Sequence, residues 1–109
     1  MPEKDLWSSP EMHTLLRAFT VLQTQEERRA FLEDLCTAQE LRLMARRLQV
    51  AQMLRQGQTY DSIRRALPVS SATITRISTQ LQFGQGGYQT VLDRFDAPEM
   101  PDAQEAQEE

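Results

Sequence analysis

The chain has 109 residues, which is enough for one compact domain but not for two. Hydrophobic residues make up 39% of it and aromatic residues 6%, a small supply for a self-sufficient core, so we expect a small helical domain that a second subunit completes. No apolar run approaches the ~18 residues of a membrane span and the N-terminus lacks the features of a signal peptide, so we expect a cytoplasmic protein without membrane contact.

The net charge of -4 is distributed unevenly along the chain. Residues 37–82 contain seven arginines against Glu40 and Asp61, whereas residues 93–109 contain seven acidic residues against one arginine. Arginine suits phosphate groups because its guanidinium can donate two parallel hydrogen bonds. A basic stretch can equally be a solvated face, so the charge indicates a nucleic-acid contact without establishing one.

Start signals divide residues 9–96 into six expected helices. They follow an N-terminal arm at residues 1–8 and precede an acidic, proline-containing tail at residues 97–109, which we expect to be disordered. The tail could screen the basic region, although an aid to solubility is the simpler interpretation. The first helix begins at Ser9-Pro10, because serine can cap a helix and proline fits its first position.

The second and third helices begin at the sequences TQEE and TAQE. Each is a capping box, in which a threonine caps and a glutamate three residues later reaches back: Thr24 with Glu27, and Thr37 with Glu40. The third helix is expected to run to about Arg55 and to stop at Gly57. Its apolar face is predicted to consist of Leu41, Met44, Ala45, Leu48, Ala51 and Leu54.

Three shorter helices complete the expected series. The fourth follows Thr59 and cannot continue through Pro68. The fifth starts near Ser70 or Ser71, and the sequence FGQGG separates it from a last helix at about residues 88–95. Since no segment alternates convincingly enough to be a strand, the predicted fold class is all-α.

The fourth and fifth expected helices are typical of a helix-turn-helix, at about residues 59–82. In a window that starts at Tyr60, the positions that form the core of such a unit are all aliphatic: Ile63, Leu67, Val69, Ile74 and Ile77. Two positions depart from the pattern, with Arg64 where a small residue is usual and Pro68 where glycine is common. An ordinary helical hairpin is the other interpretation, and the basic charge favours DNA binding over it.

The second helix of a helix-turn-helix enters the major groove with its N-terminal residues nearest the bases. Small side chains there permit close approach, and their hydroxyl and methyl groups can contact phosphates or base edges. Arginines, including Arg55, would contact phosphates, which position the protein without specifying sequence. The predicted DNA contacts are Tyr60, Arg64, Arg65, Ser70, Ser71, Ala72, Thr73 and Thr75.

The stretch TAQELRLMARRLQVAQMLRQGQTYDSIRRALPVSSATITRISTQL resembles the DNA-binding half of the Trp-repressor superfamily. About residues 5–95 are similar to its TrpR-like YerC/YecD branch, through LCTAQEL, MARRLQVAQML, GQTYDSI, ATITRIS and GGYQTVL. The resemblance implies a six-helix, intertwined homodimer that binds double-stranded operator DNA and represses or adjusts transcription. It would place two recognition helices roughly 34 Å apart, about one DNA turn.

The resemblance also points to an effector site. In tryptophan-sensing members the corepressor lies beside the helix-turn-helix between two arginines, which correspond to Arg47 and Arg76, with Thr37 matching a third pocket residue. Here Ile77 replaces a glycine that gives the ligand room, and Gln80 replaces a serine. We therefore do not expect tryptophan as a cofactor. These residues could instead hold another small effector or contact phosphate, or the arginines could form ion pairs with Glu40 or Asp61.

No pattern indicates an enzyme. The sequence lacks GxSxG, HExxH and a phosphate-binding glycine loop, and its only cysteine and only histidine have no partners at metal-ligand spacing. Two function classes remain. The first is a sequence-specific DNA-binding transcriptional regulator, a repressor acting as a homodimer. The second is a non-catalytic helical module that binds another protein through its basic face.

Overall fold

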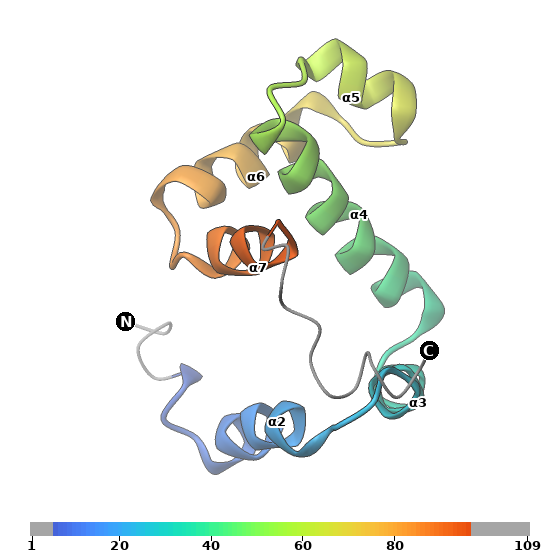
Figure 1. Ribbon diagram of the computed structural model, residues 1–109, viewed down its shortest axis with the longest axis vertical. Coiled ribbons are helices and arrows are strands. Elements are labelled where there is room, and N and C mark those ends of the chain that lie inside the picture. The colour runs from blue at the N-terminus through green and yellow to red at the C-terminus, as the bar shows by residue number, and fades with distance from the viewer. Residues whose placement is uncertain (1–5, 97–109) are drawn as a thin grey trace. The chain divides into compact units, whose positions relative to one another are not determined.

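The computed structural model describes residues 6–96, whose regular secondary structure is entirely helical. The helices are α2 (Pro10–Val21), α3 (Gln25–Leu35), α4 (Ala38–Arg55), α5 (Tyr60–Ala66), α6 (Ser71–Phe83) and α7 (Gly87–Phe95) (Figure 1). The predicted all-α class is confirmed. The tail expected at residues 97–109 and the first five residues of the expected arm lie outside the described residues.

Helices α2 to α6 begin where the sequence predicts, because local side-chain caps define their starts, whereas α7 begins after Gly86 without a side-chain cap, one residue before the expected start. The Ser9 hydroxyl accepts a hydrogen bond from the Met12 N–H at 3.2 Å. The Thr37 hydroxyl accepts from the Glu40 N–H at 3.1 Å, and the Glu40 carboxylate accepts from the Thr37 N–H at 2.8 Å. A second capping box starts α3 at Thr24. These bonds satisfy backbone N–H groups that the first helical turn leaves without partners.

A glycine ends α4. Gly57 has φ of +86°, and its N–H donates to the Leu54 carbonyl at 3.0 Å, while the Gln58 N–H donates to the Met53 carbonyl at 3.1 Å. This pair of bonds is a Schellman motif, which needs a left-handed residue just after the helix. The sequence prediction of a stop at Gly57 is confirmed.

The described residues divide into two compact units at the boundary between Cys36 and Thr37. The first contains α2 and α3, joined by an edge-to-face contact of Phe19 and Phe31 with ring centroids 5.7 Å apart. Neither helix contains a buried residue. The apolar stripe of α2 thus remains half exposed in a single chain, with Leu16 at 50% and Phe19 at 48% exposure.

The second unit contains α4 to α7 around one core. Helix α4 packs against α6 and α7, and α5 packs against α6. The fully buried side chains include Val50, Ile63, Ile74 and Ile77, and the partly buried Leu67 and Val69 pack against them. All five positions predicted for the core of the helix-turn-helix therefore belong to this core.

The predicted apolar face of α4 is partly wrong. Val50 and Met53 are buried although the pattern did not select them, whereas Met44 is 41% exposed and Ala45 is exposed. The C-terminal half of α4 has α6 and α7 as neighbours and buries Val50, Ala51 and Met53. Val50 and Met53 lie on the side of the helix away from the predicted stripe, because the buried side of α4 changes along its length, and a search for one continuous stripe misses such a change.

Candidate nucleic-acid interface

Helices α5 and α6 and the connection between them form the helix-turn-helix (Figure 1). Ile63 of α5 and Ile74 and Ile77 of α6 are buried and fix the two helices against each other. Pro68 lies in the connection, where the Val69 N–H donates to the Leu67 carbonyl at 2.9 Å. Among residues 6–96 positive φ occurs only at glycines, so this turn accommodates proline without a left-handed residue.

Ser70 is the N-cap of α6. Its hydroxyl accepts from the Thr73 N–H at 3.1 Å and donates to the Thr73 hydroxyl at 3.1 Å. The sequence left open whether Ser70 or Ser71 caps the helix, and the structure assigns the cap to Ser70. Ser71 and Ala72 then form the exposed first turn of α6. The helix start is therefore built from small side chains.

The residues predicted to contact DNA lie on α5, on the connection and on the first turns of α6. Most are exposed, and Tyr60 and Thr73 are partly buried. Two side-chain contacts cross between the helices. The Tyr60 and Thr75 hydroxyl oxygens are 3.4 Å apart, and the Arg64 guanidinium donates to the Ser71 hydroxyl. The structure thus brings the predicted residues of α5 and α6 onto neighbouring parts of one surface.

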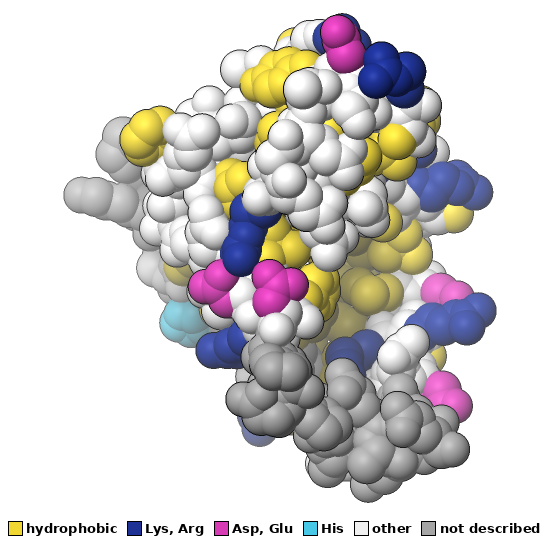
Figure 2. All heavy atoms as spheres, turned by 45° about the horizontal axis from the view of Figure 1, so that its top comes forward, with side chains coloured by type: hydrophobic (Ala, Val, Ile, Leu, Met, Phe, Trp, Pro, Cys, Tyr) yellow, Lys and Arg dark blue, Asp and Glu magenta, His cyan; other side chains and the backbone are white. Residues whose placement is uncertain are grey.

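Arg64 also forms an ion pair with Asp61 of the same helix. At the top of Figure 2, where α5 comes forward, acidic and basic side chains lie against one another. Sequence reasoning considered Asp61 as a partner of Arg47 or Arg76 and missed this pair. The three-residue spacing within a helix is the signal that could have found it.

A second group of predicted residues lines a hollow of about 230 Å³ between α4 and α6. Arg47 and Arg76 are brought together there, with Ile77 also in its lining. Arg46 lines the hollow too, and sequence reasoning did not select it. Thr37 does not line it; its hydroxyl caps the start of α4.

The ion pairs considered for Arg47 and Arg76 are not formed. The Glu40 carboxylate accepts the Thr37 N–H in the capping box, and Asp61 pairs with Arg64. Neither Arg47 nor Arg76 has an acidic partner within the part of the chain that the structure describes. Three guanidinium groups without an acidic partner in residues 6–96, those of Arg46, Arg47 and Arg76, thus border the hollow beside the start of α6.

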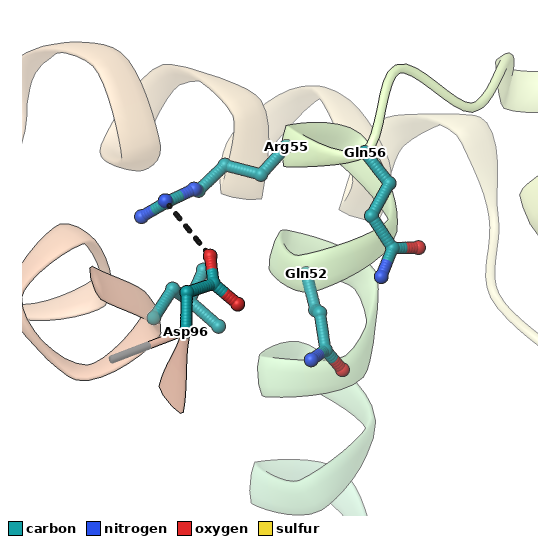
Figure 3. Close-up of a pocket in the computed structure, with 5 residues that line it drawn as sticks. Gln52, Arg55, Gln56 and Asp96 are labelled. Atoms are coloured by element: carbon teal, nitrogen blue, oxygen red, sulfur yellow. Dashed lines mark ion pairs between the residues drawn. The ribbon is translucent and has the colours of Figure 1, made fainter. Parts of the chain in front are cut away.

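Arg55, expected at the phosphates, is engaged within the protein instead. Its guanidinium lies 2.8 Å from an Asp93 carboxylate oxygen, and it donates to the Gln89 side-chain oxygen at 3.1 Å. It also lies 3.5 Å from an Asp96 carboxylate oxygen (Figure 3). These groups belong to α7 or follow it directly. In Figure 3 the Arg55 side chain extends from the end of α4 toward Asp96. Arg55 therefore ties α7 to the end of α4.

A comparison with known families identifies the group to which the chain belongs. The family model described as Trp repressor protein matches residues 10–96, from the first residue of α2 to just past α7. The chain belongs to the Trp repressor family. This match confirms the resemblance to the Trp-repressor superfamily drawn from the sequence. The relatives below confirm its YerC branch.

Three relatives agree with this assignment. The uncharacterized protein YerC of Bacillus subtilis (strain 168) is 40% identical over 84 residues, which cover 77% of this chain and 81% of YerC. A TrpR-like protein from Eubacterium eligens ATCC 27750 has a TM-score of 0.79 at 33% identity, covering 86% of this chain and 97% of that one. A candidate Trp repressor from Staphylococcus aureus has a TM-score of 0.76 at 39% identity, covering 81% and 88%.

Within residues 6–96, no group of three or more histidine, cysteine, aspartate or glutamate side chains could hold a metal ion. No helix of this Trp repressor family member, in that same stretch, is long and apolar enough to cross a membrane.

Proposed function

We propose that this Trp repressor family member is a non-enzymatic, sequence-specific DNA-binding regulator that acts as a homodimer through α5 and α6, most simply as a repressor. The observation that carries the proposal is the start of α6. There small hydroxylated side chains are exposed on a helix that Ile74 and Ile77 fix rigidly to the core. A helix held in this way can enter the major groove without rearranging.

The first turn of α6 is suited to close contact with base pairs. Ser71 and Ala72 add little bulk, so the backbone can approach the groove floor. The Thr75 hydroxyl can donate to or accept from base edges, and its methyl group can contact the methyl group of thymine. The N-terminus of the helix also favours a phosphate, because its backbone N–H groups point outward.

The arginines around this helix would supply affinity. Arg65 is exposed on α5 and has no acidic partner in the described part of the chain, so its charge is available to a phosphate. Arg47 and Arg76 are available in the same way beside the hollow. Contacts of this kind hold the protein on the duplex and carry no sequence information.

The first unit supports the homodimer. Helices α2 and α3 bury no residue in a single chain, while Leu16, Phe19 and Val21 are 48–60% exposed. A second copy that covers these side chains would remove apolar surface from water at about 25 cal/mol per Å². Two-fold symmetry would then present two α6 helices to successive turns of the major groove.

The hollow between α4 and α6 supports a second role for Arg47 and Arg76, as contacts to a small anionic effector. Ser70 and Thr73 also line it, so a ligand there would lie beside the start of α6 and could alter DNA contact. Ile77 occupies part of the lining, which argues against a ligand as large as an indole ring. DNA binding measured with and without an amino-acid mixture would reveal such an effector by a change in affinity.

The salt dependence of DNA affinity tests the proposed function. If several arginines contact phosphates, the logarithm of the association constant should fall with the logarithm of salt concentration by ~0.9 per phosphate contacted. Arg65→Gln should lower that slope by about one unit, because one phosphate contact is lost. Arg17→Gln in α2, an equal change of charge in the other unit, should leave the slope unchanged.

The same measurement separates the two function classes. Absence of duplex binding at low salt would exclude the regulator and favour the alternative, a helical module that binds an acidic protein. A steep slope that Arg65→Gln and Arg17→Gln reduce equally would show that DNA binds by charge alone and not through the helix-turn-helix.

A further inference from the structure

Arg64 is placed differently from the other arginines of the basic region. Its guanidinium makes two contacts at once, to the carboxylate of Asp61 one turn earlier in α5 and to the hydroxyl of Ser71, the first residue of α6. Arg65, its neighbour, has no acidic partner in the described residues. The cationic group of Arg64 is therefore held over the helix end that would lie nearest the bases.

Stability gives a weak reason for this arrangement. The Asp61 side chain is 71% exposed and that of Arg64 is 40% exposed, and exposed ion pairs contribute little to stability because solvent screens them. Holding an arginine in one conformation costs side-chain entropy of comparable or larger size. The main effect of the Asp61–Arg64 pair is to hold the Arg64 guanidinium in a fixed position.

The pair also changes what Arg64 can bind. A carboxylate at this position repels DNA phosphates and offsets the positive charge of Arg64, so the attraction of this arginine for the DNA backbone is reduced. Its hydrogen-bond donors are not exhausted. A guanidinium has five N–H groups, and the contacts to Asp61 and Ser71 use one on each terminal nitrogen. Enough donors remain for the two parallel bonds that a guanine base edge accepts.

We propose that Asp61 is a positioning residue for DNA recognition, which holds Arg64 against Ser71 at the start of α6 so that Arg64 reads a base edge, preferentially guanine. This inference rests on the proposed DNA-binding function and assigns Arg64 a role beyond the phosphate contact expected from the sequence. Arg65 keeps the phosphate role. Two adjacent arginines of α5 are thus divided between sequence specificity and affinity.

The experiment measures base preference with the full chain. Each base pair of a selected duplex is varied singly, and relative affinities are determined for the wild-type protein and for Arg64→Lys, Asp61→Asn, Asp61→Glu and the Asp61→Asn/Arg64→Lys double variant. Lysine keeps the charge and loses the fork, so Arg64→Lys should reduce the preference at one base pair per half-site by roughly tenfold or more. Arg65→Lys is the matched control and should leave every preference unchanged.

Asp61→Asn should weaken the preference at that same base pair, although affinity for unrelated duplexes should rise because a negative charge is removed. Asp61→Glu retains the carboxylate and should preserve part of the preference. The double variant should lose no more preference than Arg64→Lys alone, because the two residues act through one contact.

Two results would overturn the inference. One is an Asp61→Asn protein that binds all duplexes more tightly by the same factor, with its base preferences intact. The other is an effect of Asp61→Asn at a base pair that Arg64→Lys does not alter. Both leave the proposed function standing. Failure of the wild-type protein to bind any duplex would refute the proposed function as well.

Discussion

Thr73 combines two requirements in one side chain. It is the third residue of α6, its backbone N–H and hydroxyl both contact the capping Ser70, and it lines the hollow beside Arg76. Ser70 and Thr73 therefore serve the helix start structurally, whichever further contacts they make to DNA. Capping and DNA contact are compatible for Thr73, because its backbone N–H bonds to the Ser70 hydroxyl while its side-chain methyl group takes no part in the cap.

Thr73→Asp should lower affinity for a selected duplex by about tenfold or more, because a carboxylate near the phosphates is repelled by them. An acidic residue in the first turn of a helix favours folding, so thermal stability should not fall. Thr79→Asp, the same change six residues later in α6, is the control and should have a smaller effect. Equal affinities of Thr73→Asp and wild type for the duplex would show that the groove face is assigned wrongly.

The contacts of some residues could be predicted from the sequence, and those of others could not. The sequence narrows the cap of α6 to Ser70 or Ser71, because a cap bonds to a backbone N–H only a few positions away. The contact of Arg64 with Ser71 and the arrangement of Arg46 with Arg76 depend on how α4, α5 and α6 pack. No local pattern contains that information.

At the scale of elements, the chain relies on local signals at both helix ends. The capping boxes and the Gly57 stop lie within a few residues of each boundary, and for this reason the helix bounds followed from the sequence. The buried side of α4 did not follow, because Val50 and Met53 are buried by helices that come later in the chain. The start of a helix is determined by residues near it in the sequence, whereas the helices that pack against it come from distant parts of the chain.

The end of α4 offers a test of this local control. Gly57→Ala should lower the free energy of unfolding by about 1–2 kcal/mol, because an alanine at φ of +86° is strained although nothing lies within 4 Å of the added carbon. Gly87→Ala, in the first turn of α7, also meets nothing within 4 Å and has no positive φ, so it should be neutral or slightly stabilising.

Denaturant unfolding of both variants at one protein concentration gives the comparison, since assembly would otherwise shift the midpoints. If the two alanine variants were destabilised equally, the left-handed conformation of Gly57 would not account for the loss of stability, and the Schellman motif would not control the end of α4.

At the scale of the whole molecule, the distribution of charge matters more than its total. The chain is acidic overall, yet its arginines concentrate in residues 37–82, which form α4 to α6. An acidic chain can therefore still present a basic surface. The second unit holds its own core, whereas α2 and α3 contain no buried residue, so we propose that the second unit contacts DNA and the first assembles the dimer.

Selection of bound duplexes from random DNA by the full chain tests the central claim, that a homodimer reads DNA with paired α6 helices, most directly. We expect a two-fold symmetric site whose half-sites are centred about one helical turn apart, roughly 10 base pairs. We also expect Thr73→Asp to abolish enrichment of that site. Failure to enrich any sequence, or enrichment of a single unsymmetrical site that Thr73→Asp leaves intact, would contradict the claim.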